Sequence, residues 1–346
     1  MRRMAAGLDP TRLFVDSQPT QVQVPDVAGS VPDVRAGSLR AWLVVVRPHS
    51  LLVAISPVLV GVAVGYARTG NVDPVATLLV LVAAVLVQAI SNMQNDVGYT
   101  LRGAERHGGR RGLPRATSHG WLRVEEVRAA IVIASVAAMA VGLLLVAHRG
   151  PWVLPIGTLS LVAALAYMAG PRPIAYTPFG EATVFVFFGL VAVLGTDWVV
   201  TGSIGAITVI ASVAMGCLAA AALCVNNHRD VAHDRDVGRR TFAVVFGPVV
   251  SRRLYAVLLA TPFLLLPAMA IVAPSATTMS RATPPFSTIF LLPILLTPVA
   301  WSLVRDFSHC APGTAFNAIL FRTFKLELAY AVLLAASAVL SRNVPA

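Results

Sequence analysis

The sequence predicts an all-α membrane protein whose chain crosses the bilayer nine times. Of its 346 residues, 57% are apolar and only 12% are charged, whereas soluble proteins average about 45–50% apolar and about 25% charged residues. Apolar stretches recur along the chain, each close to the ~20 residues that a helix needs to cross a ~30 Å hydrocarbon core. This composition excludes a soluble globule, a disordered chain and a nucleic-acid-binding module, and it makes the lipid bilayer the expected surroundings.

The apolar segments follow a polar amino-terminal tail. We expect this tail, residues 1–42, to be disordered, because it is polar, contains Pro and Asp, and has no apolar core of signal-peptide length. Leu39 to Val46 form a short amphipathic approach, a membrane domain occupies 43–340, and 341–346 form a second short tail. Gly170-Pro-Arg-Pro must break the helix after the fourth segment. The predicted spans are 43–66, 76–97, 126–147, 151–169, 179–200, 204–227, 251–273, 285–304 and 319–340.

The basic residues indicate how the chain is oriented. The net charge is +11, and all 27 basic residues except Lys325 are arginines. With nine spans, 23 of the 27 fall on the side of the amino terminus, and only Arg68, Arg149, Arg281 and Arg342 fall on the other. The positive-inside rule then predicts a multi-pass protein of a bacterial-type cell membrane, with its amino terminus in the cytoplasm. The three cysteines are too few and too ill-spaced for a disulfide framework or a zinc site.

Two cytoplasmic connections, 96–125 and 226–252, are longer than a helix–helix link requires and begin with polar motifs. At the end of the second span, Asn92 and Asp96 share one helix face, with Asn95 beside them. At the end of the sixth span, Asn226, Asp230 and Asp234 follow at four-residue intervals and predict one column of side chains. Hard oxygen ligands of this kind suit Mg²⁺. A single Asn or Asp here is equally a helix cap, but ionisable groups at membrane-embedded helix ends are candidates for function.

Arginines surround both motifs and predict an anionic ligand. Carboxylates for Mg²⁺ beside guanidinium groups are what a diphosphate requires. The residues therefore favour a membrane enzyme that holds a lipid diphosphate at the cytoplasmic interface, makes diphosphate a good leaving group and lets a nucleophile capture the allylic cation. The alternative is that these arginines serve topology and bind anionic lipid headgroups. They are Arg102, Arg106, Arg110, Arg111 and Arg115 after the first motif, and Arg229, Arg235, Arg239 and Arg240 after the second.

Several ordered motifs between Val44 and Leu340 carry a family resemblance. Asn92-x-x-x-Asp96 and Asp230-x-x-x-Asp234 on nine predicted helices resemble the UbiA superfamily of intramembrane prenyltransferases. Further segments are similar to its 1,4-dihydroxy-2-naphthoate polyprenyltransferase branch, which acts in menaquinone synthesis. These segments are Arg47-Pro-His-Ser-Leu, Tyr167-Met-Ala-Gly-Pro-Arg-Pro-Ile-Ala-Tyr176, Gly180-Glu-Ala-Thr-Val-Phe-Val-Phe-Phe-Gly189, Gly195-Thr196, Asn226-Asn-His-Arg-Asp230 and Gly238-Arg-Arg-Thr241.

The resemblance implies a helical bundle around a central cavity and a Mg²⁺-dependent transfer of an isoprenyl group from an isoprenyl diphosphate to an aromatic acceptor. It implies that Asn92, Asp96, Asp230 and Asp234 hold the metal, with Asp96, Asp230 and Asp234 catalytic. Asn95, Asn226 and Asn227 would support them, and Arg47, Arg102, Arg115, Arg240 and Lys325 would bind diphosphate or acceptor. Tyr167 and Tyr176 would line the acceptor or cation pocket, although interfacial tyrosines are also simple membrane anchors.

One departure from the family pattern concerns the first motif. Tyr99 stands where an aspartate is usual, and Glu105 is a possible replacement ligand, because a neutral phenol cannot act as a carboxylate toward Mg²⁺. The acceptor is therefore either that of menaquinone synthesis or another aromatic ring of specialised metabolism. Two further alternatives are a carrier or transporter of a lipid diphosphate and a non-catalytic relative. Charges crowded at one interface speak against a transporter, whose site lies near the bilayer midplane.

Overall fold

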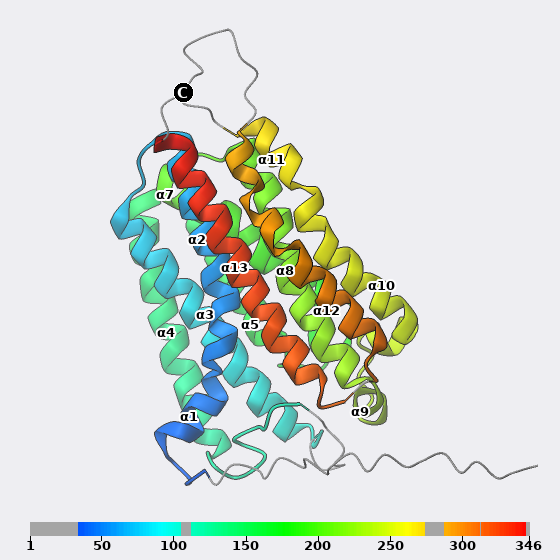
Figure 1. Cartoon of the computed structure of the whole chain (residues 1–346). Coiled ribbons are helices and arrows are strands. Elements are labelled where there is room, and N and C mark those ends of the chain that lie inside the picture. Colours follow the sequence, from blue (N-terminus) through cyan, green and yellow to red (C-terminus); the bar gives the residue numbers. More distant parts are fainter. Residues whose placement is uncertain (1–33, 105–111, 274–286, 312, 344–346) are drawn as a thin grey trace, which may run out of the picture. The chain divides into compact units, whose positions relative to one another are not determined.

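The computed structural model describes residues 34–104, 112–273, 287–311 and 313–343, which form helices, turns and irregular connections (Figure 1). A short helix, α1 (Leu39–Val46), covers the predicted amphipathic approach, and α2 begins at once with Pro48, a residue suited to a first helical turn. The chain breaks again at Gly170–Pro173, as predicted, and the final helix continues through residues 341–343, which the sequence assigned to a tail. The first main helices are α2 (Pro48–Thr69), α3 (Pro74–Leu101), α4 (Val124–Arg149) and α5 (Val153–Ala166).

Three of the later spans are composite. The segment Gly180–Thr201 begins and ends as α-helix but passes through a wider π-helix in its middle. The remaining elements are η2 (Ile174–Tyr176), α6 (Gly180–Val184), η3 (Phe185–Leu194, the π-helix), α7 (Gly195–Thr201), α8 (Ala206–Arg229), α9 (Val231–Asp236), α10 (Phe242–Leu264), α11 (Leu266–Val272), η4 (Thr288–Leu296, a 3₁₀-helix), α12 (Thr297–His309) and α13 (Phe316–Asn343).

The all-α polytopic architecture is confirmed, but the predicted count of nine membrane spans is not. Within the described ranges, eight helical segments are long and apolar enough to cross a bilayer. The fourth predicted span, 151–169, differs because only the 14 residues of α5 are α-helical. At 1.5 Å per residue, α5 is about 21 Å long, shorter than a ~30 Å hydrocarbon core.

Helix α8 lies at the centre of the bundle, packed against α2, η3, α10 and α13. Its middle is rich in small residues, including the run Ala219 to Ala222, and this lets neighbouring backbones approach closely. One close approach joins Gly216 of α8 to Gly189 of η3, where a Cβ on Gly189 would lie 2.5 Å from the Gly216 Cα. Small side chains therefore determine how tightly the cavity wall formed by η3 packs on the core.

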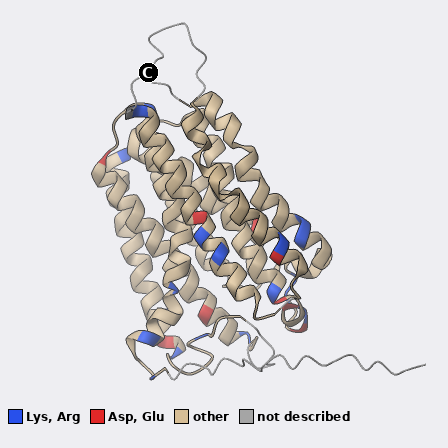
Figure 2. Cartoon of the chain, in the orientation of Figure 1, with Lys and Arg blue, Asp and Glu red and all other residues tan. Residues whose placement is uncertain are grey.

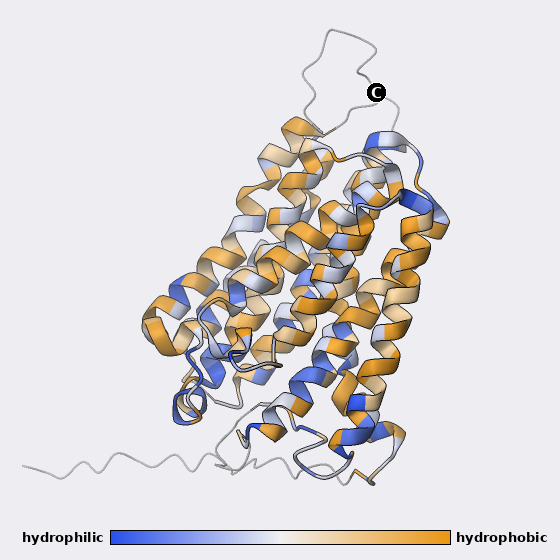
Figure 3. Ribbon diagram, turned by 180° about the vertical axis from the view of Figure 1, so that it is seen from behind, coloured by the Kyte–Doolittle hydropathy of each residue, from blue (hydrophilic) through white to orange (hydrophobic). Residues whose placement is uncertain are grey.

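The outer faces of the helices are apolar, as expected of surfaces that meet lipid (Figure 3). On α4, for example, Val132, Ile133, Val136 and Leu143 are all exposed. Charged residues gather mostly toward one end of the bundle, with a smaller group at the opposite end (Figure 2). This distribution agrees with the uneven sorting of basic residues among the predicted loops.

The smaller group of charges ties helix ends together. Arg68 pairs with the fully buried Asp197 at 2.9 Å, and Asp197 also accepts a hydrogen bond from Thr208. Asp73 caps α3 and contacts His148 at 2.7 Å. Arg149 and Arg342 lie at the same end, bonded to backbone carbonyls of the segment Val199–Val200 and of Ala67, respectively. Three of the four basic residues that the topology assigns to this side thus cluster together, and Arg281 lies outside the described residues.

Candidate active site

The first polar motif lies at the C-terminal end of α3. The Asn92 amide nitrogen donates to the Val46 carbonyl oxygen at 2.7 Å and to the Ser50 hydroxyl at 2.8 Å. One turn further, Asp96 is fully buried, and its carboxylate accepts backbone N–H bonds from Ala116 (3.1 Å) and Thr117 (2.9 Å) and the Thr117 hydroxyl at 2.5 Å. These contacts hold the connection after α3 against the helix end.

The second motif lies where α8 ends. Asp230 has non-helical backbone angles, φ −97° and ψ 11°, so the chain starts a new short helix, α9, at Val231. The predicted column of Asn226, Asp230 and Asp234 therefore does not lie on one helix, because α8 ends at Arg229 and α9 begins at Val231. The N–H groups of Asp230 and Asp234 still donate to carbonyls four residues earlier. Asp230 pairs with Arg229 at 2.7 Å, and Asp234 pairs with Arg239 at 2.6 Å.

Asp234 is a buried carboxylate with one oxygen in use. Oδ1 accepts from Arg239, whereas Oδ2 has no hydrogen-bond partner among the described residues. Burial raises the pKa of Asp234, and the neighbouring Arg239 guanidinium opposes that rise. Asp234 Oδ2 is therefore a buried acceptor whose lone pairs no described donor uses.

Arg239 connects the two motifs. Besides Asp234, its buried guanidinium donates to the Ala175 carbonyl and to the Tyr99 hydroxyl. The Arg115 guanidinium lies 4.0 Å from the centre of the Tyr99 ring, on the other branch of the network. Tyr99, the residue that departs from the family pattern, thus lies between two guanidinium groups and acts as a bridge across 140 residues of sequence.

The connection after α5 completes this network. Arg102 donates to the Gly170 carbonyl, and its guanidinium lies 5.0 Å from the Tyr176 ring centre. Burial raises the pKa of Tyr176, so that its phenol stays neutral. The Arg240 backbone N–H donates to the Tyr176 carbonyl, while the Arg240 side chain is exposed. Arg102 and Tyr176 therefore belong to the motif network, and the Arg240 side chain stands outside it.

Two buried residues of the site, Arg239 and Glu181, were not among the residues assigned from the sequence. Glu181 on α6 is 6% exposed and accepts a hydrogen bond from the Asn227 amide at 2.9 Å, while its Oε2 has no partner among the described residues. The sequence signal for Glu181 was an acid at the start of an apolar span. Arg239 was named only as one of the arginines after the second motif, and nothing local set it apart, because its partners Tyr99 and Ala175 lie on distant segments.

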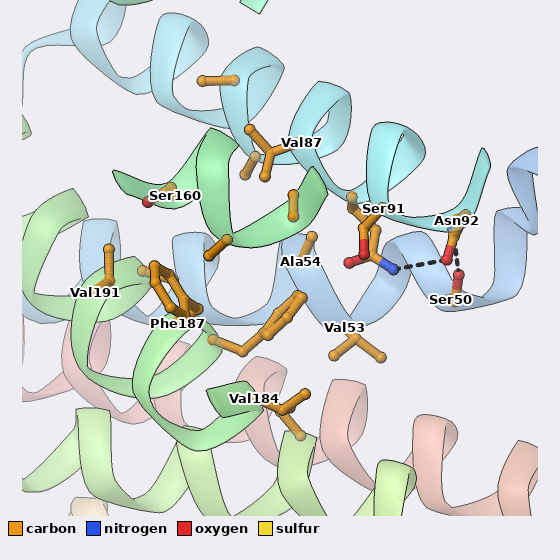
Figure 4. Close-up of a pocket in the computed structure, with 18 of the residues that line it drawn as sticks. Ser50, Val53, Ala54, Val87, Ser91, Asn92, Ser160, Val184, Phe187 and Val191 are labelled. Carbon is orange, nitrogen blue, oxygen red and sulfur yellow. Dashed lines mark hydrogen bonds between the residues drawn. The ribbon is translucent and has the colours of Figure 1, made fainter. Parts of the chain in front are cut away.

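A cavity of about 840 Å³ runs between α2, α3, α4, α5 and η3. Most of its lining is apolar, and Figure 4 shows Phe187 and Val191 of η3 and Val87 of α3 among the side chains that line it. One end of the cavity is polar. It is lined by Arg47, Ser50, Asn92, Asn95, Tyr167, Asn226 and Arg229.

The structure thus groups most of the predicted site residues in two adjoining sets. Arg47, Asn92, Asn95, Tyr167 and Asn226 line the cavity. The acids lie behind this lining, Asp96 and Asp234 in the buried network and Asp230 on Arg229. Lys325 is exposed and lines no part of the cavity, although Phe324 beside it does. Glu105 lies outside the described residues.

The donor set at this end of the bundle fits Mg²⁺. Among the described residues, no three His, Cys, Asp or Glu side chains converge on one point. The unpartnered oxygens of Asp234 and Glu181 are nevertheless hard acceptors, and Asn92 and Asn95 bring amide oxygens to the cavity lining. Mg²⁺ is commonly held by one or two carboxylates, with water and phosphate oxygens completing its shell, so such a partial protein shell is sufficient.

The helical bundle encloses an apolar cavity that ends among arginines and amides, with buried acids beside them. This arrangement suits an enzyme that acts on an anionic lipid. Residues 54–326 match the model of the UbiA prenyltransferase family. The chain belongs to this family and is a prenyltransferase.

Relatives and solved structures agree with this assignment. The chain is 35% identical over 226 residues to the 1,4-dihydroxy-2-naphthoate octaprenyltransferase of Escherichia coli, covering 64% of this chain and 73% of that protein. It is 33% identical over 231 residues to the enzyme of the same name from Mycobacterium tuberculosis, covering 64% and 75%. A UbiA homologue from Archaeoglobus fulgidus bound to DMAPP and Mg²⁺ has the same fold, with TM-score 0.62, 17% identity, and coverage of 88% of this chain and all of that one.

Proposed function

We propose that this chain transfers an isoprenyl group from an isoprenyl diphosphate to 1,4-dihydroxy-2-naphthoate, within the membrane and with Mg²⁺. The single observation that carries the proposal is the cavity, whose long apolar lining leads to an end formed by arginines and amides. Such a cavity suits one molecule with an apolar tail and an anionic head. The names of the relatives at 30–35% identity favour the dihydroxynaphthoate acceptor over other aromatic rings.

The polar end would hold the diphosphate head. Arg47 and Arg229 line it and bring guanidinium groups that pair with phosphate oxygens. Asp96, Asp230 and Asp234, together with the oxygens of Asn92 and Glu105, would hold Mg²⁺. When bound, the metal supplies positive charge that stabilises the departing diphosphate.

Arg102, Arg115 and Arg239 would act mainly through the network that they form. The Arg239 guanidinium orients Asp234 and, through Tyr99 and Arg115, ties the second motif to the first. Held in this way, the acidic groups keep their places while charge develops on the leaving group, which is the condition for electrostatic stabilisation without rearrangement.

The apolar lining would hold the isoprenyl tail and exclude water from the allylic cation. Tyr167 lines the cavity, and the face of its ring would stabilise the cation as it does an ammonium group. The carbon–oxygen bond to diphosphate breaks, and the acceptor ring carbon forms the new carbon–carbon bond. When that ring carbon bears the carboxylate, loss of carbon dioxide restores the aromatic ring. Asn226 and Tyr176 would orient the acceptor.

We further propose that the site faces the cytoplasm. The site lies at the end of the bundle where the topology gathers 23 of the 27 basic residues, which supports this orientation. A soluble acceptor from the cytoplasm would then reach the site directly, and the lipid diphosphate would enter from the membrane.

The test is product formation by membranes that contain the chain. They are incubated with 1,4-dihydroxy-2-naphthoate and isoprenyl diphosphates of several lengths, with Mg²⁺ or with EDTA, and the quinol product is measured. We expect Mg²⁺-dependent product and its loss in the double variant Asp230→Ala/Asp234→Ala. Asp236→Ala removes an exposed acid of the same loop and is the matched control. Undiminished activity of the double variant would refute the metal assignment, and diphosphate binding without product from any acceptor would favour a carrier.

A further inference from the structure

The junction between α1 and α2 turns on one unusual residue. Arg47 has φ 55° and ψ 70°, and it is the one non-glycine residue with positive φ in the described ranges. A side chain makes this left-handed conformation sterically unfavourable, whereas glycine adopts it readily. The following Pro48 restricts the same residue further. The surrounding structure must therefore hold the turn, here called the Arg47 elbow (residues 46–50).

One side chain from another helix spans this elbow. Asn92 of α3 donates one amide hydrogen to the carbonyl of Val46, just before the turn, and the other to the hydroxyl of Ser50, just after it. The Ser50 hydroxyl in turn donates to the Arg47 carbonyl at 2.9 Å. Figure 4 shows the contact between Asn92 and Ser50 beside the cavity. Both donors of the Asn92 amide are thus used on the elbow.

The Asn92 oxygen is turned to a different partner. Asn92 Oδ1 accepts a hydrogen bond from the Gln88 amide at 3.1 Å, which fixes which end of the amide faces the elbow. A carbonyl oxygen accepts two hydrogen bonds or ligands, so this contact leaves one lone pair of Oδ1 for a cation. The nitrogen and the oxygen of Asn92 therefore have separable tasks.

We propose that Asn92 is a positioning residue whose two N–H groups hold Arg47 in its left-handed conformation. This conformation places the Arg47 guanidinium in the lining at the polar end of the cavity, where it binds a diphosphate oxygen. The inference rests on the proposed function for the identity of the ligand, but the elbow itself does not. A glycine would adopt the turn without steric cost, so the side chain is the reason for an arginine at this position.

The test uses Asn92→Asp, which keeps an oxygen for a cation but removes both N–H donors. The first readout is hydrogen exchange of the backbone in peptides covering residues 43–50. The second is the Kd of farnesyl diphosphate, and the third is the Mg²⁺ concentration for half-maximal binding. We expect faster exchange and a Kd about tenfold higher, equivalent to about 1.4 kcal/mol, with a half-maximal Mg²⁺ concentration changed less than about twofold. Asn71→Asp makes the same exchange at an exposed site at the other end of the bundle and is the control.

Two further variants separate the elbow from the added charge. Ser50→Ala removes one acceptor of the Asn92 amide without changing charge, and it should shift the hydrogen exchange and the Kd in the same direction by a smaller amount. In an Arg47→Gln background, Asn92→Asp should raise the Kd little further, because the guanidinium that the elbow positions is gone. Repulsion between the new carboxylate and the diphosphate would instead persist in that background.

The outcomes distinguish the two levels of the inference. Exchange at residues 43–50 that is unchanged in Asn92→Asp and in Ser50→Ala would overturn the elbow. Faster exchange with an unchanged Kd would overturn the link from Arg47 to the diphosphate, which belongs to the proposed function. A full rise in Kd that persists in the Arg47→Gln background would also overturn the positioning role.

Discussion

Replacing Arg239 by lysine tests whether its guanidinium joins the two acidic motifs. The guanidinium is buried and donates to three acceptors, namely the Asp234 carboxylate, the Ala175 carbonyl and the Tyr99 hydroxyl. A lysine ammonium keeps the charge opposite Asp234 but lacks the planar fork that reaches all three acceptors. The substitution therefore preserves the ion pair and removes the bridge.

The magnitude follows from the hydrogen bonds that a lysine at this position cannot make. The lost hydrogen bond to the Tyr99 hydroxyl contributes about 1 kcal/mol, and the buried Ala175 carbonyl left without a donor costs about 1–3 kcal/mol. We expect Arg239→Lys to lower the free energy of unfolding by about 2–4 kcal/mol on this basis. Arg239→Met, which leaves Asp234 as an unpaired buried carboxylate, should cost about 3–5 kcal/mol. Prenyl transfer should fall in both variants because Asp234 is no longer held in register with the first motif.

The assay is denaturant unfolding of the purified protein in detergent, followed in parallel with prenyl transfer. Arg235→Lys changes an exposed arginine of the same loop and serves as the control. A double-variant cycle with Tyr99→Phe isolates the bridge, since the two changes should not add if the hydroxyl acts through Arg239. If Arg239→Lys matches the control within about 0.5 kcal/mol and retains wild-type activity, the bridging role is refuted.

Three further predictions concern other parts of the molecule. Asp96→Ala should lower turnover about tenfold or more, measured at saturating substrates, because it removes both a proposed ligand and the acceptor for the N–H groups of Ala116 and Thr117; unchanged turnover would exclude both roles. Gly189→Ala should destabilise the fold by about 1–3 kcal/mol, since its Cβ would lie 2.5 Å from Gly216 Cα and from the Ser212 carbonyl oxygen; Gly142→Ala, with open space around it, is the control in the same unfolding assay. The Ala76 backbone N–H, and after it His148, holds the pKa of Asp73 below its ordinary 3.8 against the effect of burial. A lowered folded-state pKa stabilises the fold above the ordinary value, and this contribution is lost as the pH falls through the folded-state pKa. The difference in thermal midpoint between wild type and Asp73→Ala should therefore be full at about pH 5 and shrink below about pH 4, and a pH-independent difference would contradict it.

The sequence predicted the helices well where the signal was local. The length of an apolar stretch and the polar residues at its ends depend on one segment at a time, so eight spanning helical segments and the break at Gly170–Pro173 could be located directly. The exceptions have physical causes. A buried apolar run does not distinguish α-helix from the π-helix of η3, and the hydropathy of α5 did not reveal that its helix stops at Ala166.

The candidate site was predictable in its composition but not in its pairings. The residue types at Asp96, Asp230 and Asp234 marked two acidic motifs, and the arginines around them marked an anionic ligand. The pairing of arginines with acids depends on how each helix is rotated about its axis and on where each connecting loop packs against the bundle. Arg239 therefore could not be distinguished from Arg235 or Arg240 in the sequence, although only Arg239 of the three is buried.

By itself the sequence determined the membrane setting, the all-α class and the end of the bundle where the polar motifs lie, because the free energy of placing apolar and charged groups in a bilayer acts on each segment independently. Only the tertiary structure decided that Asn92 reaches the Arg47 elbow, that Tyr99 bridges to Arg239, and that Lys325 lies away from the cavity. The first two contacts join residues that are 46 and 140 positions apart in the sequence. The third relation distinguishes Lys325 from its neighbour Phe324, which does line the cavity. They arise from how helices pack, and packing depends on all segments together.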